Sequence, residues 1–195
     1  KQECERLIGI SEQLGFLPDA AVSLPRSVRH NDSLTWIVDE QTDGTIWRRI
    51  VHLMDDRQAI FDGSEALGLN ARFRFYRYNP DDFFKPHSDG AWPGSRIIND
   101  KLVANAYPDR FSKMTALIFL SDEFQGGATR FMINGDDPTR PAMIGNKVNN
   151  IDSRTPTGSI LCFPHGMHPL HCVHSSVPIT NGTKYIIRSD VLFKL

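Results

Sequence analysis

Tyr-Asn-Pro-Asp-Asp-Phe-Phe-Lys-Pro-His-Ser-Asp, residues 78–89, is the stretch of this chain that decides its fold. The strand-like run 72–78 leads into it, and a polar turn follows at 79–82. His87 and Asp89 stand two residues apart, so on an extended backbone they point to the same side. They provide two adjacent ligands for one face of a metal ion. Because two ligands hold a metal weakly, a stable site requires a third ligand further along the chain.

The composition is that of an ordinary globular domain. The chain has 195 residues, of which 40% are hydrophobic and 23% charged, enough for one domain with a substantial core. The net charge is −1 and no block is strongly basic, which argues against a nucleic-acid partner. No apolar run approaches the roughly 20 residues of a membrane-spanning helix. We therefore expect a single domain, residues 1–195, that is a monomer, binds no nucleic acid and has no membrane span.

The cysteines constrain the cellular compartment only weakly. Cys4, Cys162 and Cys172 form no CxxC pair, and their odd number favours a reducing compartment over a disulfide scaffold. The cytoplasm is therefore the favoured location. The chain starts at Lys1 without a methionine, so a targeting segment that once preceded it stays an open alternative.

Helical periodicity is found near the start of the chain, and strand periodicity after it. Apolar spacing predicts a helix over residues 3–16 and a second one, capped by Thr42 or Asp43, that continues to about Ile60. A short strand is expected at 33–38. From Ala71 the apolar period changes to two, which is typical of strands. These strands are expected at 72–78, 113–120, 128–132, 142–144, 147–151, 159–163, 171–177 and 183–193.

This order of elements predicts the fold class. Two helices followed by many short strands indicate a mainly β (α+β) fold with N-terminal helices packed on one side of a β core. No helices separate the later strands, which argues against a parallel βαβ sheet. We expect residues 1–67 to form the helical flank and residues 68–195 the core, with a loop at 90–108.

The second half of the chain offers several candidates for the third ligand, since a histidine recurs at every third position: His165, His168, His171 and His174. Pro164, Gly166 and Pro169 argue against a helix here. In an extended chain a spacing of three alternates between faces, so all four histidines cannot converge. A zinc site built from this run is one alternative, with the other histidines facing solvent or held by hydrogen bonds.

The last predicted strand, 183–193, carries cations between apolar residues. Lys184 and Arg188 lie on one face, and both faces are partly apolar, so the strand is expected to be central. A buried cation there needs an anion, which is either an aspartate such as Asp190 or a bound carboxylate. A structural ion pair is the simpler explanation of this strand alone. With two histidines and one carboxylate as ligands, however, an octahedral iron(II) keeps three positions for a 2-oxo acid and dioxygen.

These motifs resemble those of the prolyl-4-hydroxylase-like group of iron(II)/2-oxoglutarate-dependent dioxygenases. The resemblance extends from about Gly68 to the C-terminus, and four pieces carry it in the same order: 69–78 with 84–90, 115–122 with 126–131, 158–165, and 174–193. It implies that the core is a double-stranded β-helix, a jelly-roll-like fold with the helices packed on one side.

The resemblance also implies roles for single residues. Those that correspond to the iron(II) ligands are His87, Asp89 and His174. Lys184, ten residues after His174, corresponds to the residue that binds the C5 carboxylate of 2-oxoglutarate. Tyr78, nine residues before His87, corresponds to a tyrosine that hydrogen-bonds this cosubstrate, although a core aromatic residue is the alternative.

Several positions leave alternatives open. Arg188 is an alternative or auxiliary partner of the C5 carboxylate. His171 competes with His174 as a ligand, although it lies thirteen residues before Lys184 rather than ten. Phe84 stands where many members of the group have a tyrosine, so an aromatic wall is kept and a hydroxyl is lost.

The resemblance further implies hydroxylation of a C–H bond, with iron(II), 2-oxoglutarate and O2 required and ascorbate as a further cofactor. The expected substrate is a prolyl residue of a peptide or protein, and another side chain or a free small molecule is the alternative. Trp92 and Arg74 are candidate substrate contacts, unless Trp92 only anchors its loop and Arg74 only forms a local ion pair. A non-catalytic jelly-roll module, with a structural metal or none, is the competing class of function.

Overall fold

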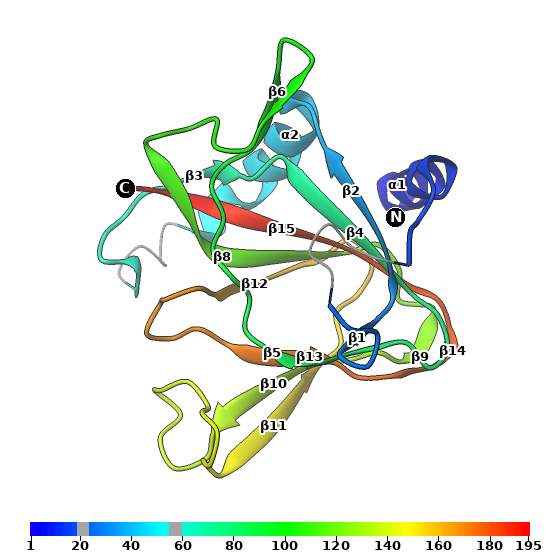
Figure 1. The fold of residues 1–195 in the computed structure, drawn as a ribbon, viewed down its shortest axis with the longest axis vertical. Helices are drawn as coiled ribbons and strands as arrows, with labels where there is room; N and C mark the ends of the chain where they lie inside the picture. The colour runs from blue at the N-terminus through cyan, green and yellow to red at the C-terminus, as the bar shows by residue number, and fades with distance from the viewer. Residues whose placement is uncertain (19–23, 55–59) are drawn as a thin grey trace.

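Two antiparallel sheets form the core of the computed structural model, which describes residues 1–18, 24–54 and 60–195 (Figure 1). The larger sheet runs in the order β12 (Ile160–Pro164), β8 (Arg110–Phe119), β15 (Lys184–Lys194), β4 (Arg72–Tyr78) and β2 (Asp32–Ile37), with β3 (Ala66–Leu69) paired to β15. The five-stranded sheet runs in the order β1 (Arg29–His30), β5 (Phe83–His87), β13 (Val173–Ser176), β10 (Thr129–Asn134) and β11 (Val148–Ser153). The predicted mainly β fold class is confirmed.

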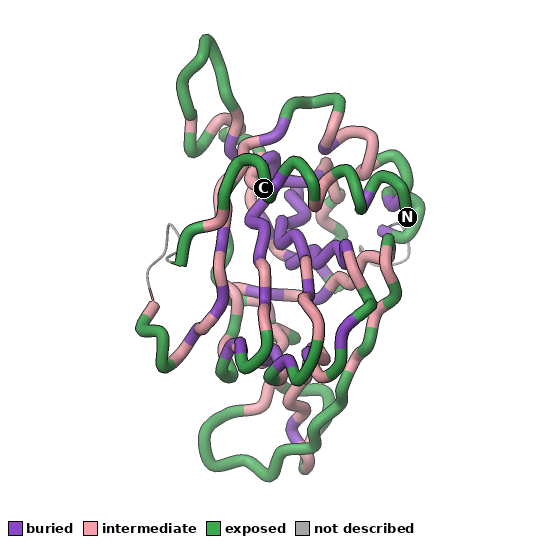
Figure 2. The backbone as a smooth tube through the Cα atoms, turned by 90° about the vertical axis from the view of Figure 1, so that its right-hand side faces the viewer, coloured by how far each residue is buried: buried purple, intermediate pink, exposed green. Residues whose placement is uncertain are grey.

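Two small pairs of strands complete the β structure. β9 (Phe124–Gly126) pairs with β14 (Ile179–Gly182), and β6 (Arg96–Ile98) pairs with β7 (Lys101–Val103). The β6–β7 hairpin and the loop between β10 and β11 project from opposite ends of the molecule and are largely exposed (Figures 1 and 2).

The helices cover one face of the larger sheet. Helix α1 (Gln2–Leu14) and helix α2 (Glu40–Ile50), which a short 3-10 turn (Val51–Leu53) follows, pack against it. Odd-numbered residues of β4 and β15, such as Phe75 and Ile187, face the helices, whereas even-numbered ones, such as Tyr78 and Ile186, face the other sheet. Strand β15 is therefore buried on both faces, as its two partly apolar sides predict. No helix of the described residues is long and apolar enough to cross a membrane.

Helix α2 differs from its predicted bounds. Asp39, rather than Thr42 or Asp43, caps it, since the Asp39 carboxylate accepts a hydrogen bond of 2.7 Å from the backbone N–H of Thr42. The helix ends at Ile50, so the predicted continuation toward Ile60 is too long; residues 55–59 of that prediction lie outside the described residues.

Short strands account for most other differences. Residues 142–144 were expected to form a strand, but they form a turn region in which Asn146 caps the backbone of Met143. The predicted loop 90–108 contains the β6–β7 hairpin. Strands β3, β9 and β14 have only three or four residues each, too few for an alternating pattern to be recognised.

Candidate metal centre

The pairing of β5 with β13 brings two histidines together. His87 at the end of β5 lies directly opposite His174 in the antiparallel register. Asp89 follows two residues after His87, and the three side chains each place a ligand atom within 4.8 Å of the others. Over residues 1–18, 24–54 and 60–195 no other group of three histidine, cysteine, aspartate or glutamate side chains is gathered in this way. The predicted candidate ligands therefore lie together.

The hydrogen bonds of the two imidazoles fix their orientation. Nδ1 of His87 donates to the backbone carbonyl of Lys85 at 2.8 Å, and Nδ1 of His174 donates to that of Cys172 at 3.1 Å. The Nε2 atoms then carry free lone pairs, and each lies 3.7 Å from a carboxylate oxygen of Asp89. This is the tautomer in which a histidine binds a metal ion through Nε2 while a backbone carbonyl holds its other nitrogen.

The protonation states also suit a cation. Burial and the neighbouring His174 lower the pKa of His87 to about 4, and burial lowers the pKa of His174 as well. Burial opposes the ionisation of Asp89, but Arg188 and the two imidazoles hold the pKa of this carboxyl well below its ordinary value. Two neutral imidazoles beside one ionised carboxylate form a donor set that fits a divalent metal ion.

Aromatic rings wall the site. The ring of Phe84 stacks on His87 with a centroid distance of 3.5 Å and an interplanar angle of 15°. Phe163 meets His174 edge to face at 4.7 Å, and Phe131 packs on Phe163 at 5.1 Å. The aromatic wall expected of Phe84 is therefore present. Such walls exclude water and strengthen the electrostatic interactions inside the site.

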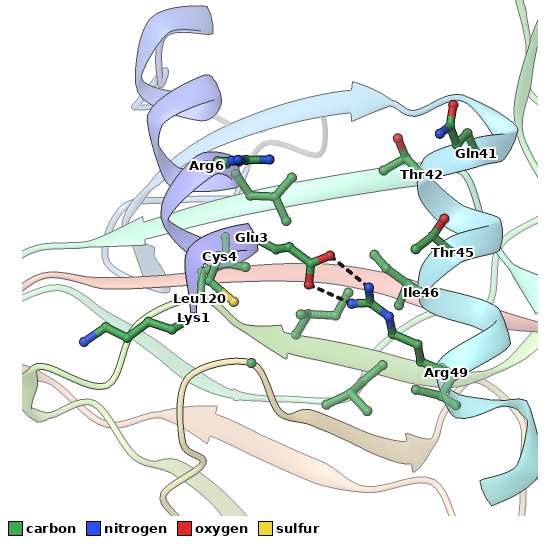
Figure 3. A pocket seen from close by; sticks show the side chains of 15 residues that line it. Lys1, Glu3, Cys4, Arg6, Gln41, Thr42, Thr45, Ile46, Arg49 and Leu120 are labelled. Atoms are coloured by element: carbon green, nitrogen blue, oxygen red, sulfur yellow. Dashed lines mark hydrogen bonds and ion pairs between the residues drawn. The ribbon is translucent and has the colours of Figure 1, made fainter.

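A much larger cavity than the one beside these residues lies away from them. A cavity of about 590 Å³ lies between α1 and α2 on the helix-covered face of the larger sheet, where Glu3 and Arg49 form a two-fold ion pair (Figure 3). The cavity against His87, Asp89 and His174 has only about 30 Å³, room for a single water molecule. The smaller cavity is the candidate functional site, since of these two cavities it alone is lined by His87, Asp89 and His174.

Lys184 lies just behind this small cavity. Its side chain is fully buried, and Nζ donates hydrogen bonds to the carbonyl oxygen of Gly127 at 2.6 Å and to Oγ of Ser176 at 3.3 Å. Ser176 itself lines the cavity. In the part of the chain that the structure describes, no carboxylate contacts Nζ. Burial, with a contribution from Arg154, therefore lowers the pKa of Lys184 to about 7.

Tyr78 is the register partner of Lys184 on the neighbouring strand. Its ring lines the cavity and lies 5.4 Å from Nζ of Lys184. Burial raises the pKa of the Tyr78 phenol above its ordinary value. The hydroxyl therefore stays protonated and is available as a hydrogen-bond donor.

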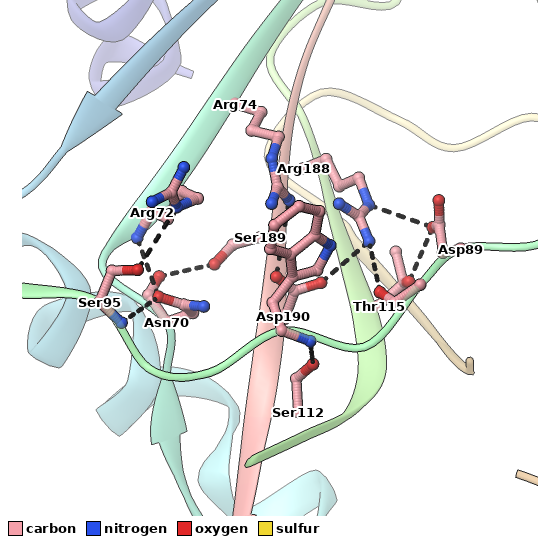
Figure 4. A network of polar contacts seen from close by, with 12 residues as sticks. Asn70, Arg72, Arg74, Asp89, Ser95, Ser112, Thr115, Arg188, Ser189 and Asp190 are labelled. Carbon is pink, nitrogen blue, oxygen red and sulfur yellow. Dashed lines mark hydrogen bonds and ion pairs between the residues drawn. The ribbon is translucent and has the colours of Figure 1, made fainter. Parts of the chain in front are cut away.

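Arg188, the other cation on this face, is directed at carboxylates of the protein. Its Nε lies 3.1 Å from Oδ2 of Asp89, and one terminal nitrogen lies 3.1 Å from Oδ1 of Asp190 (Figure 4). These two carboxylates raise the pKa of Arg188, although burial opposes this. Arg188 thus contacts a candidate metal ligand, an arrangement that the alternation of the strand alone does not reveal.

The two candidate substrate contacts pack on each other. The guanidinium of Arg74 lies over the ring of Trp92 at 4.7 Å and pairs with Asp190 at 3.6 Å. Arg74 is buried, so the local ion pair considered for it and the role of Trp92 as a loop anchor describe the contacts present.

The histidine run separates as expected. His165 is buried and hydrogen-bonded to Ser112 and Thr115. His168 contacts the carbonyl of Ile60, and Nδ1 of His171 contacts the carbonyl of His168. Only His174 reaches Asp89, so neither the zinc cluster nor His171 as a ligand is supported by the geometry of the described residues.

Thr115 contacts a candidate ligand and was not among the residues expected from the sequence. Its hydroxyl donates a hydrogen bond of 2.8 Å to Oδ2 of Asp89. Thr115 shares a face of β8 with Leu117, which lines the cavity. Its place on the inner face could be inferred from the alternation of the strand, but its partner depends on where the loop after β5 returns.

No family model and no curated protein matches this chain. Solved structures do. The viral collagen prolyl hydroxylase of Paramecium bursaria Chlorella virus-1, in complex with 2-oxoglutarate, is 15% identical over 99% of this chain and 90% of that chain, with a TM-score of 0.59. A prolyl-4-hydroxylase of Pseudomonas putida is 15% identical over 99% of this chain and 82% of that chain, with a TM-score of 0.55.

A prolyl hydroxylase of Trichoplax adhaerens, in complex with a hypoxia inducible factor peptide fragment, is 19% identical over 99% of this chain and 76% of that chain, with a TM-score of 0.56. At these identities the likeness concerns the fold. The chain has the double-stranded β-helix fold of prolyl hydroxylase structures, and the predicted jelly-roll-like core is confirmed.

Proposed function

We propose that this chain, which has the fold of prolyl hydroxylases, is an iron(II)- and 2-oxoglutarate-dependent dioxygenase that hydroxylates a C–H bond. One observation carries the proposal. His87, Asp89 and His174 direct metal-binding atoms at one point, beside a buried cation, Lys184, that no described carboxylate neutralises. A buried charge of this kind is costly unless an anion meets it, and a dicarboxylate cosubstrate provides that anion.

In this proposal the three ligand side chains hold iron(II), which supplies the redox chemistry that couples oxidation of a C–H bond by dioxygen to decarboxylation of 2-oxoglutarate to succinate. His87 and His174 bind as neutral imidazoles. Each keeps its proton on Nδ1, which donates to the backbone carbonyl of Lys85 or Cys172, and Nε2 is free to bind the metal. The rings of the aromatic wall exclude water from the reacting groups.

Lys184 and Tyr78 bind the cosubstrate. The ammonium of Lys184 exchanges the carbonyl oxygen of Gly127 for the C5 carboxylate of 2-oxoglutarate, and the Tyr78 hydroxyl donates a hydrogen bond to it. Since the cavity holds about one water molecule, side chains around it must move when the cosubstrate enters. Arg188 is already paired with Asp89 and Asp190, so we assign it to the carboxylate ligand rather than to 2-oxoglutarate.

We propose a prolyl residue of a peptide or protein as the substrate, which the likeness in fold to a prolyl hydroxylase in complex with a peptide supports. Another side chain or a free small molecule is the competing substrate class, and product analysis by mass spectrometry separates them.

Ascorbate is proposed as a reductant that keeps the iron divalent. We further propose that the enzyme is a monomer, in which one chain contains every residue of the site.

The test needs no substrate. Iron(II) and 2-oxoglutarate are added to the metal-free protein without oxygen, and the weak visible charge-transfer band of the chelate is recorded. We expect a band in the wild type, no band in His174→Ala, and a band that needs about 10- to 100-fold more 2-oxoglutarate in Lys184→Ala, since a charged hydrogen bond is lost.

His168→Ala is the matched control, because its imidazole contacts the carbonyl of Ile60, the N–H of Leu170 and the ring of Phe61 and does not line the cavity. Its titration should equal that of the wild type. No band in the wild type, together with zinc in the purified protein, would instead support a non-catalytic module with a structural metal.

A further inference from the structure

A chain of four hydrogen bonds leads from the loop after β5 to the candidate metal ligand. The backbone N–H of Trp92 donates to Oγ of Ser112 at 2.7 Å, and this oxygen lies 2.9 Å from Nε2 of His165. Nδ1 of His165 lies 2.8 Å from Oγ1 of Thr115, whose hydroxyl lies 2.8 Å from Oδ2 of Asp89. His165 is at the centre of the chain and has no other role in the proposed chemistry.

The direction of every bond in this chain is determined. A threonine hydroxyl has one proton, and Thr115 gives it to Asp89, so Thr115 must accept from Nδ1–H of His165. Burial lowers the pKa of His165, which keeps the ring neutral. Nε2 is then an acceptor and receives the proton of the Ser112 hydroxyl. With the proton on Nε2 instead, Thr115 would have one proton for two acceptors, Nδ1 of His165 and Oδ2 of Asp89, and one of the four bonds would be lost.

The chain holds one oxygen of the carboxylate and leaves the other free. Oδ2 of Asp89 accepts the hydrogen bond of the Thr115 hydroxyl and forms an ion pair with Nε of Arg188 at 3.1 Å. No hydrogen bond to Oδ1 is present among the described residues, and this oxygen faces Nε2 of His87 at 3.7 Å. The rotation of the carboxylate is therefore set by groups that do not themselves bind the metal.

The turn around His165 also packs against the backbone of the loop that follows β5. The backbone N–H of Gly166 donates to the carbonyl oxygen of Asp89 at 2.9 Å. A Cβ at Gly166 would lie 3.0 Å from Cβ of Ala91, so the two segments are in close contact. The His165 segment thus reaches both the backbone and the side chain of Asp89.

We propose that His165 is a positioning residue of the metal centre. Through Thr115 it fixes Oδ2 of Asp89, and through Ser112 it connects this carboxylate to the loop that carries Trp92. The inference rests on the proposed function in one respect, that Asp89 binds the metal.

The test is a cobalt(II) titration of the metal-free protein under nitrogen, followed by visible absorption. Thr115→Val removes the hydroxyl at constant shape, and His165→Gln removes the donor at the Nδ1 position; we expect each to weaken cobalt binding about 10-fold. Thr115→Ser and His165→Asn keep a donor at the required place, and we expect them to bind within about two-fold of the wild type.

Two further variants separate positioning from a general structural role. The double variant Thr115→Val with His165→Gln should bind no more weakly than Thr115→Val alone, because His165 acts through Thr115. Ser112 has no hydrogen bond to Asp89. Ser112→Ala nevertheless removes the hydroxyl that donates to Nε2 of His165, so the ring is free to adopt the other tautomer. We expect it to weaken cobalt binding and to shift the absorption spectrum in the direction of His165→Gln.

The outcomes distinguish the two proposals. If the wild type takes up no cobalt, the metal centre itself is refuted. If the wild type binds and His165→Gln binds equally well, or if the losses in the double variant add, the role of His165 is refuted. Thermal unfolding of each metal-free variant identifies any that fail to fold, and Ser112→Ala with the Thr115 pair then carries the test without His165→Gln.

Discussion

Lys184 is a buried amine whose charge depends on what occupies the cavity beside it. Its two hydrogen-bond acceptors, Gly127 and Ser176, are neutral, so they do not offset the cost of burying an ammonium group. A carboxylate that enters the cavity changes this balance in favour of the charged form. Proton uptake and cosubstrate binding are therefore expected to be linked at this one residue.

The pH dependence follows from this linkage. Burial lowers the pKa of Lys184 to about 7 in the ligand-free protein. Below this pH the ammonium is already present, whereas above it 2-oxoglutarate must bind together with a proton. We expect the affinity of the metal-loaded protein for 2-oxoglutarate to fall by up to about ten-fold per pH unit above pH 7. Calorimetry in two buffers of different ionisation enthalpy at about pH 8 should detect the uptake of nearly one proton.

Lys184→Arg is the control for this prediction, since a guanidinium keeps its charge throughout this range. Its affinity, even if weaker, should not change between about pH 6.5 and pH 8.5. Constant affinity of the wild type over the same range would contradict the assigned role of Lys184.

At the scale of elements, strand alternation made part of the site predictable. Strand alternation placed Lys184 and Arg188 on one face, whereas Tyr78 was implied by the family resemblance; the antiparallel pairing of β4 with β15 brings Tyr78 and Lys184 into register. The shared face of Lys184 and Arg188 follows from the period of two. The partners of these residues do not follow from it, because they come from elements that are distant in sequence. The contact of Arg188 with Asp89 depends on where the loop after β5 lies.

The same limit applies to Thr115 and His165. Each is unremarkable in the sequence, one within an apolar strand and the other in a histidine run. Their contact arises because β12 pairs with β8 in a register that aligns Phe163 with Thr115. A register between two strands some forty residues apart is not specified by local propensity. The fold class, in contrast, depends on the order of periodic segments, which the chain shows directly.

The turn that supports Lys184 makes a prediction about stability. Gly126 has φ of 74°, and a Cβ there would overlap the carbonyl oxygen of Pro178 on the neighbouring segment. We expect Gly126→Ala to lower the free energy of unfolding by about 3 kcal/mol, since the backbone strain and the displacement of Pro178 add. Urea denaturation measures the loss.

Gly145→Ala isolates the contribution of the backbone. Gly145 has φ of 92°, but the space around its Cβ position is open. This variant should lower the free energy of unfolding by only about 1 kcal/mol. Equal costs at Gly126 and Gly145 would show that the contact with Pro178 contributes nothing.

At the scale of the whole molecule, the candidate site lies between the two sheets. His87 and His174 belong to the five-stranded sheet, whereas Tyr78, Thr115 and Lys184 belong to the larger one. A metal ion bound to the first pair and a cosubstrate bound to Lys184 would therefore join the sheets through a contact that the apolar core alone does not make. Ligands that bind only the folded state stabilise it by mass action.

Thermal unfolding should show that 2-oxoglutarate binds only after the metal ion. Manganese(II), which can replace iron(II) without oxidation, should raise the midpoint of unfolding. At a free concentration of about 100 times its dissociation constant, it raises the free energy of unfolding by about 2.7 kcal/mol. 2-Oxoglutarate should raise the midpoint further only when manganese is present, because its chelating end needs the metal. Lys184→Ala should keep the increment from manganese and lose most of that from 2-oxoglutarate, whereas His174→Ala should lose both. A midpoint that 2-oxoglutarate raises equally with and without manganese would place its binding site away from His87, Asp89 and His174, and the cosubstrate would then have to bind on one sheet alone.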